Sequence, residues 1–197
     1  MSAERTFTPS EAAVITGVPL SAVHKAIDAG PLGKERAREP GKRTLLKTDV
    51  IYLAAISIFD PTLMQLTDQA KERLWKAISA TPNVRKIMLA EGLNLDLNRV
   101  VARVWANTTL LDRARKMVVV NPAIRGGEPI LRGTRIGVYE VAAMAKDATA
   151  DERAEILAGY PTLKEEQLDL ALIFATAYPR RGRPPRHPWH LEAEDHV

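Results

Sequence analysis

The sequence NPAIRGGEPILRGTRI, residues 121–136, constrains the fold more than any other part of this chain. The three valines at 118–120 predict a short buried strand, and Pro-Ile-Leu at 129–131 predicts the strand that returns beside it. Between them, Gly126-Gly127 supplies a tight turn with backbone angles that other residues rarely adopt. The stretch therefore predicts a β-hairpin, and a helical pattern follows it from near Val138.

Gly133 follows the returning strand directly, and because the chain must turn abruptly there, we expect it to adopt a positive φ. Glycines on both sides of a loop also suggest a phosphate-binding loop. Such a loop is not expected, because Gly127 and Gly133 are separated by five residues instead of four. In addition, Arg132 stands where no lysine of such a loop would be. The residues expected to shape the loop are Gly126, Gly127, Arg132, Gly133, Thr134 and Arg135. Two roles stay open for Arg132 and Arg135: anion binding or, more often for such arginines, a tie to helix C-terminal carbonyls or carboxylates.

Two blocks of this region resemble domain-of-unknown-function family 433. The first consists of Asn121-Pro122, then Gly-Gly-Glu-Pro-Ile at 126–130, then Arg-Gly-Thr-Arg-Ile at 132–136. The second, at 155–163, is Glu-Ile-Leu-Ala-Gly-Tyr-Pro-Thr-Leu, a helix that ends in Tyr-Pro-x-Leu. The resemblance covers about residues 118–178. It implies an antitoxin of a bacterial toxin–antitoxin pair, beside a PIN-like ribonuclease toxin.

Three helical patterns follow the hairpin, at residues 138–146, 149–158 and 162–178. Capping boxes are expected to open the second and third, formed by Thr149 with Glu152 and by Thr162 with Glu165. The last pattern carries two apolar stripes, Leu163, Leu170, Ala171, Phe174 and Tyr178 in one and Leu168, Leu172 and Ala175 in the other. A surface helix buries one stripe, so either a partner chain covers the second or the helix is central in its own core.

The N-terminal part predicts a helix-turn-helix. Thr8, Pro9 and Glu11 form a helix start with a capping box, and Gly17 ends this first helix. The second helix, at about residues 19–29, places Leu20, Val23 and Ile27 on one face. Its opposite face is polar and consists of Ser21, His24, Lys25 and Asp28. That face could enter a DNA major groove, whereas the alternative is a dimerisation module whose polar face is solvated.

Basic charge concentrates after the second helix, where residues 29–48 hold six basic and two acidic side chains. A short strand at 44–46 and a third helix at 49–57, capped by Thr48, follow. The order helix, turn, helix, basic hairpin, helix over about residues 6–59 resembles the winged helix-turn-helix of the MerR-like group. This resemblance implies DNA binding. We expect Ser21, His24 and Lys25 to face bases and the basic stretch to hold phosphates through Arg36, Arg38, Lys42 and Arg43.

The middle segment, residues 61–117, carries no chemical motif. A helix is predicted at 67–80, with Trp75 off its apolar stripe and packed either by another element or by a second chain. Residues 84–97 predict a β-hairpin in which leucines alternate with polar residues. A further helix begins at Asn98, and Asn-Thr-Thr at 107–109 could interrupt it.

The tail from residue 179 contains four prolines within twelve residues, which exclude a helix. Its Arg/Pro composition suits an extended chain that crosses an acidic groove, such as the carboxylate site that the resemblance implies for the toxin. The residues expected to bind the toxin are Arg180, Arg181, Arg183, Arg186 and Trp189. The alternative is a solvated extension that aids solubility.

Catalysis is not expected, because the chain has no cysteine and its four histidines form no metal-binding or nucleophile motif. Neither a metal nor another cofactor is implied. The chain has no run of about 18 apolar residues, the length needed to cross a membrane. The N-terminus has no signal-peptide core, so a cytoplasmic location is expected.

The expected fold is mainly helical, of the α+β class, in four parts. These are a winged helix-turn-helix at 1–60, a linker with helices and a β-hairpin at 61–117, a small three-helix domain with a short hairpin at 118–178, and the tail at 179–197. The expected function is an antitoxin that neutralises a PIN-like ribonuclease by direct binding and represses its operon on operator DNA. It would act as a homodimer or in a hetero-oligomer with the toxin. The rival is a stand-alone MerR-like transcriptional regulator; an RNA-binding module would need an aromatic-rich sheet, which the sequence lacks.

Overall fold

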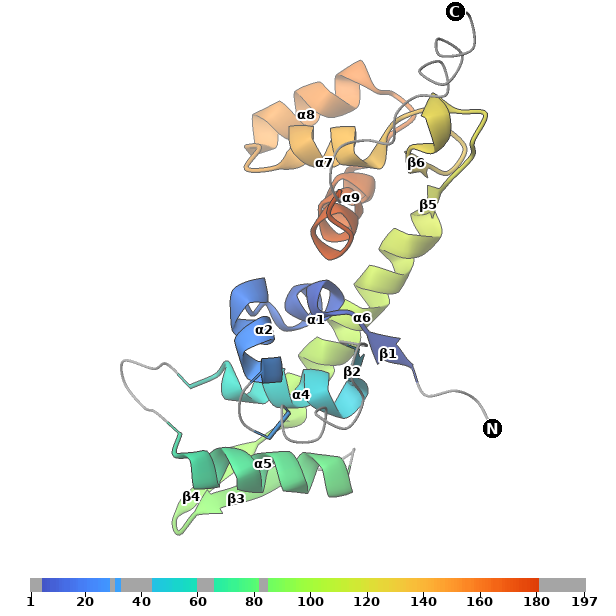
Figure 1. Ribbon diagram of the computed structural model, residues 1–197. Helices are drawn as coiled ribbons and strands as arrows, with labels where there is room; N and C mark the ends of the chain where they lie inside the picture. The colour runs from blue at the N-terminus through green and yellow to red at the C-terminus, as the bar shows by residue number, and fades with distance from the viewer. Residues whose placement is uncertain (1–4, 29–30, 33–43, 60–65, 82–84, 181–197) are drawn as a thin grey trace, which may run out of the picture. The chain divides into compact units, whose positions relative to one another are not determined.

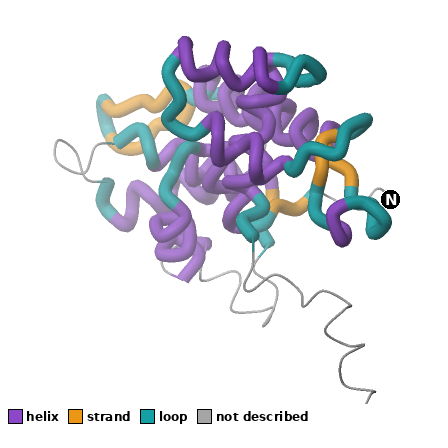
Figure 2. The backbone as a smooth tube through the Cα atoms, turned by 90° about the horizontal axis from the view of Figure 1, so that it is seen from above, coloured by secondary structure: helices purple, strands orange, loops and turns teal. Residues whose placement is uncertain are grey.

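The computed structural model describes residues 5–28, 31–32, 44–59, 66–81 and 85–180. The chain divides into two compact units, Met1–Leu111 and Asp112–Val197. Helices predominate in both, and each strand belongs to a small two-stranded sheet (Figures 1 and 2). The expected mainly helical α+β class is therefore confirmed.

Unit 1 begins with β1 (Thr6–Phe7), α1 (Pro9–Thr16) and α2 (Leu20–Asp28). The predicted capping box opens α1: the Thr8 N–H donates to Glu11 Oε2 over 2.7 Å, and the Glu11 N–H donates to Thr8 Oγ1 over 3.2 Å. Gly17 ends α1 in the left-handed region, with a φ of 74°. The turn therefore forms as the sequence predicts, and α2 follows it directly.

The third helix begins earlier than predicted. It is α4 (Lys47–Ile56), and it follows β2 (Leu45–Leu46), which pairs antiparallel with β1. Thr48 is not its cap; instead the Asp49 carboxylate, in the first turn, accepts the N–H of Leu46 over 2.7 Å. The basic residues predicted to form the wing, Arg36, Arg38, Lys42 and Arg43, lie outside the described residues.

The middle of the chain contains α5 (Asp68–Ala80), β3 (Lys86–Ala90), β4 (Leu93–Asp96) and α6 (Asn98–Met117). Helix α5 packs on α4, and the hairpin of β3 and β4 contacts α5 through β3. Trp75 is buried and meets the ring of Tyr52 edge-on, with centroids 5.6 Å apart. Another element of the same unit therefore packs it, and no second chain is needed.

Helix α6 runs without a break through residues 107–109, so the Asn-Thr-Thr sequence does not interrupt it. The Thr108 and Thr109 hydroxyls donate to the carbonyls of Val104 and Trp105, one turn earlier. Asn107 Nδ2 donates to the Ile15 carbonyl over 2.7 Å. These side chains bond without taking the backbone out of the helix, which is why a sequence that often disrupts helices is accommodated.

Unit 2 contains the predicted hairpin, in which β5 (Val118–Val119) pairs antiparallel with β6 (Ile130–Leu131). A short 3-10 turn, η1 (Arg125–Gly127), lies between the strands. Gly126, Gly127 and Gly133 have φ values of 63°, 82° and 79°. The expectations of a glycine turn and of a positive φ at Gly133 are therefore confirmed.

Three helices complete unit 2: α7 (Val138–Ala145), α8 (Ala150–Gly159) and α9 (Glu165–Ala177), with α9 seen nearly along its axis in Figure 1. Side chains from both predicted stripes of α9 enter one core, among them Leu168, Ala171, Leu172, Phe174 and Ala175. The helix is thus central in the core of its own unit, and its second stripe needs no partner chain to cover it.

The capping box predicted for α8 forms, since the Thr149 N–H donates to Glu152 Oε2 over 2.7 Å. The box predicted for α9 is wrong. A turn in which the Leu163 N–H donates to the Tyr160 carbonyl keeps Thr162 outside the helix. The helix begins at Glu165, and Gln167 Oε1 accepts the Lys164 N–H over 2.8 Å in place of the expected pair.

Candidate functional site

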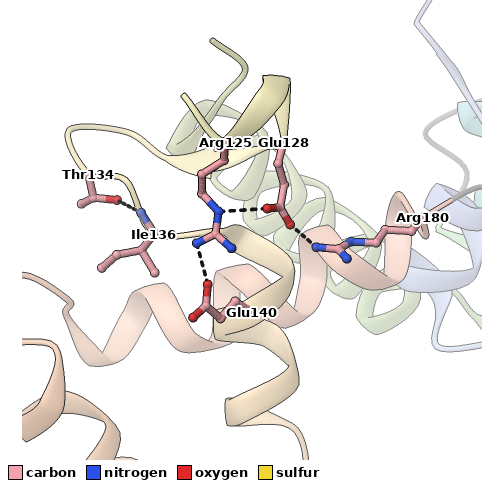
Figure 3. A network of polar contacts seen from close by, with 6 residues as sticks. All are labelled: Arg125, Glu128, Thr134, Ile136, Glu140 and Arg180. Carbon is pink, nitrogen blue, oxygen red and sulfur yellow. Dashed lines mark hydrogen bonds and ion pairs between the residues drawn. The ribbon is translucent and has the colours of Figure 1, made fainter. Parts of the chain in front are cut away.

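The loop between β5 and α7 is held together by a network of charged side chains (Figure 3). Arg125 stands at its centre with a φ of 49°. Its Nε donates to Glu128 Oε2 over 3.0 Å, and its Nη1 donates to Glu140 Oε2 over 2.8 Å. The hydrogen bond to Glu140 is the largest of the influences that raise the pKa of the Arg125 guanidinium. The network thus ties the turn to the first turn of α7.

The backbone of Gly137 lies against this network. A Cβ at this position would be 3.4 Å from Arg125 Cζ and 3.5 Å from Glu128 Cδ. These are ordinary van der Waals distances, so an alanine here would lie in contact with the ion pair without displacing it. The φ of Gly137 is −66°, so neither its backbone angles nor its contacts require glycine at this position.

Glu128 also holds the start of the tail, through an ion pair with Arg180 (Figure 3). The Arg180 guanidinium carbon lies 4.7 Å from the centre of the Tyr139 ring. The Tyr139 hydroxyl donates to the Tyr178 carbonyl over 2.6 Å, and burial raises the pKa of that hydroxyl. The chain that leaves α9 is therefore fastened to the loop and to α7 at three points.

The loop residues predicted from the sequence have local roles. Arg132 Nε donates to the Lys116 carbonyl over 3.0 Å, at the C-terminal end of α6, which corresponds to the structural one of its two expected roles. The Thr134 hydroxyl donates to the Leu131 carbonyl over 2.9 Å. It also accepts the Ile136 N–H over 3.0 Å. The exposed Arg135 side chain forms no hydrogen bond or ion pair among the described parts of the chain.

The charged network itself was not predicted from the sequence. Arg125, Glu128 and Glu140 were not among the expected site residues, although Glu128 is part of the Gly-Gly-Glu-Pro-Ile block. That block was the only sequence signal for the network. Glu140 lies 15 residues from Arg125 and Arg180 lies 52 residues from Glu128, and charges so far apart give no local pattern.

The predicted DNA-facing residues lie on α2 as expected for a polar face. Ser21 and Lys25 are exposed and His24 is half-buried, whereas Val23 and Ile27 are buried. Leu20, expected on the apolar face, is the first residue of the helix and is 38% exposed. Of the predicted toxin-binding residues, Arg180 is engaged by Glu128, and Arg181, Arg183, Arg186 and Trp189 lie outside the described residues.

Within the described ranges, no group of three or more His, Asp or Glu side chains could hold a metal ion. Among the helices described, none is long and apolar enough to cross a membrane.

Comparison with known proteins places the loop and the helices around it in one family domain. Residues 118–175, from β5 into α9, match the family described as "Protein of unknown function (DUF433)". The chain is 32% identical over 186 residues to "Uncharacterized protein y4eO" of Sinorhizobium fredii (strain NBRC 101917 / NGR234), an alignment that covers 88% of this chain and 82% of that protein. No solved structure matches the chain. The chain therefore belongs to the family of y4eO, and its residues 118–175 are a DUF433 domain.

Proposed function

We propose that the protein is an antitoxin that neutralises a PIN-like ribonuclease by direct binding and represses its own operon by binding operator DNA. The observation that carries the proposal is the presence, in one chain, of a helix-turn-helix with an exposed polar second helix and of a DUF433 domain. Proteins with this domain resemble antitoxins, and antitoxins that regulate their own synthesis need a DNA-binding part. In this proposal the chain itself has no catalytic activity.

The DNA-binding half rests on how α2 is held. Val23 and Ile27 are buried and fix the helix on the core, while Ser21 and Lys25 point their polar groups to solvent. A helix that is anchored on one face and polar on the other can enter a major groove without unfolding. The basic side chains that follow, among them Lys42 and Arg43, would then hold phosphates.

Binding to the DNA upstream of the gene, measured by fluorescence anisotropy across a salt series, tests this half. Because each phosphate contact releases counterions, a Lys42→Ala/Arg43→Ala chain should bind more weakly, with the slope of log K against log salt reduced by about two. Lys76→Ala is the control, since Lys76 lies on α5 and pairs with Glu72. Unchanged affinity and slope in the double variant would remove the wing from the proposal.

The toxin-binding half rests on the tail. Guanidinium groups pair with carboxylates in a bidentate way, and prolines extend the chain in advance and so lower the entropy lost on docking. The tail arginines therefore match a nuclease site that gathers carboxylates around a metal. The stable part of the complex would come from the folded domain, so loss of the tail should weaken inhibition more than binding.

The contacts of Arg180 determine where the tail should be cut. A chain that ends after Tyr178 also loses the ion pair with Glu128 and the contact with the Tyr139 ring. A chain that ends after Arg180 keeps both and removes the remaining arginines. In a nuclease assay with the toxin, both truncated chains should inhibit less than the parent. Full inhibition by the chain that ends after Arg180 would show that the rest of the tail is only a solvated extension. DNA binding by a chain that has no toxin partner would favour the stand-alone regulator.

A further inference from the structure

A surface groove of about 410 Å³ lies beside the root of the tail on unit 2. Its lining is mostly apolar and aromatic, and consists of Arg115, Val118, Val119, Val120, Pro129, Tyr139, Phe174 and Tyr178. Val120 is 63% exposed, which is unusual for a valine between two structured segments. Phe174 packs against both tyrosine rings, with centroids 6.1 Å from Tyr139 and 4.9 Å from Tyr178. Three aromatic rings that pack against one another therefore line part of the groove.

Strand β5 forms one wall of this groove and has an open edge. The far edge of β6 is covered, because the Leu131 N–H donates to the Ile136 carbonyl and the Val138 N–H donates to the Pro129 carbonyl. No described strand pairs with the far edge of β5. The Arg132 N–H donates to the Met117 carbonyl, so Met117 is hydrogen-bonded to the strand opposite. In an antiparallel pair, residues alternate between bonding the neighbouring strand and pointing away from it. The Val118 C=O and the Val120 N–H therefore point away from β6. An extended segment could hydrogen-bond to them as an added strand.

Arg115 gives the groove a charge preference. Its side chain is exposed at the rim and forms no ion pair within the ranges that the structure describes. The nearby Arg180, in contrast, is already paired with Glu128. A ligand that places a carboxylate beside Arg115 would therefore gain a charge-assisted contact at the edge of an apolar surface, where the contact is less screened than in open solvent.

We propose that this groove docks an extended segment of a partner protein that carries an aliphatic or aromatic side chain followed by a carboxylate. The apolar side chain lies on the Tyr139, Phe174 and Tyr178 surface, the backbone adds to β5, and the carboxylate pairs with Arg115. This inference deepens the proposed function, on which it rests, by assigning the groove to a segment of the toxin other than its metal site.

Two pools of fluorescein-labelled hexapeptides test the chemistry of the groove without the toxin. In both pools, Leu, Val or Phe occupies the second and fourth positions; Asp or Glu occupies the last two in one pool, and Lys occupies them in the other. Fluorescence polarisation with the full chain should show binding to the acidic pool at least about tenfold tighter than to the basic pool. Arg115→Glu should reverse that preference, and Val120→Asp should weaken binding of both pools.

Arg135→Glu is the matched control, because Arg135 is an exposed arginine of the same unit that does not line the groove. It should keep the preference of the parent. Equal binding of the two pools by the parent would overturn the proposal. The proposal would also be overturned if Arg135→Glu lost the preference for acidic peptides as Arg115→Glu does. The preference would then depend on the net charge of the chain and not on the groove. Thermal melts of each variant establish that it is folded.

Binding experiments with the toxin itself distinguish failure of this inference from failure of the proposed function. Val120→Asp should weaken toxin binding at least about tenfold while DNA binding stays as in the parent. If the parent neutralises a PIN-like ribonuclease and Val120→Asp binds it equally well, the groove proposal fails and the proposed function stands. If Val120→Asp instead converts a dimer of the parent into a monomer in sedimentation experiments, a second copy occupies the groove. Tighter peptide binding by the chain that ends after Arg180 would assign the groove to the tail, and either result overturns the proposal.

Discussion

Replacing Gly133 with alanine changes the backbone energy at one position of the loop and little else. Gly133 has a φ of 79°, and a Cβ added there would meet no atom within 4 Å. An alanine in the left-handed region costs on the order of 1–2 kcal/mol. Its smaller unfolded-state entropy offsets roughly 0.4–1 kcal/mol of that loss. We therefore expect unit 2 to lose about 1 kcal/mol, which lowers the Tm of a domain of this size by about 4–8 °C.

The assay is differential scanning calorimetry of the full chain, in which the two compact units can unfold in separate transitions. Gly159→Ala is a matched control in the same unit. Gly159 is the last residue of α8, its added Cβ would also meet nothing within 4 Å, and its φ lies outside the left-handed region. Because alanine favours a helix over glycine by up to about 1 kcal/mol, this variant should match or exceed the Tm of the parent.

The two variants therefore shift stability in opposite directions although each adds one methyl group. A Gly133→Ala protein with the Tm of the parent would refute the strain argument. An equal fall in Gly159→Ala would show that the methyl group itself, and not the φ angle, is responsible.

Two further outcomes follow from the packing. Gly137→Ala would place a Cβ 3.4 Å from Arg125 Cζ, an ordinary van der Waals contact, at a position whose φ of −66° any residue adopts. In denaturant unfolding the variant should therefore match the parent or exceed it by up to about 1 kcal/mol, because alanine lowers the entropy of the unfolded chain, and a clear loss of stability would contradict this expectation. Burial, with a smaller contribution from Asp68, raises the pKa of Tyr52 from 10.0 to about 12. The folded state thus holds this proton more tightly, so the contribution of Tyr52 to stability is complete below pH 10 and declines as the pH rises to about 12. The unfolding free energy of Tyr52→Phe should fall less over that range than that of the parent; parallel curves would contradict the assignment.

Elements with a local chemical signal could be predicted from the sequence. Thr8 with Glu11 and Thr149 with Glu152 are spaced so that each side chain reaches the backbone of the other, and both capping boxes form. The same signal failed at Thr162, because the turn after Pro161 delays the helix until Glu165. A capping box describes which residues can cap, whereas the preceding turn decides where the helix begins.

Contacts between distant parts of the chain could not be predicted in this way. Glu128 pairs with Arg125 three residues away and with Arg180, 52 residues away. The chain has 28 basic and 24 acidic side chains, and the local sequence does not show which of them pair. Likewise, Trp75 meets Tyr52 only because α5 packs on α4. Side-chain periodicity places a residue on a face, but the element that covers that face follows from the tertiary fold.

Tyr139 connects the loop network, the groove and the tail in one side chain. Its ring lines the groove and contacts the Arg180 guanidinium, and its hydroxyl donates a hydrogen bond to the Tyr178 carbonyl. A partner segment that packs on this ring contacts the same residue that directs the chain out of α9. In the proposed complex, docking in the groove would therefore occur next to a tail whose starting point is already fixed by Glu128. The entropy lost in bringing the tail to its target is smaller when that point is fixed, which would favour binding through the domain followed by inhibition through the tail.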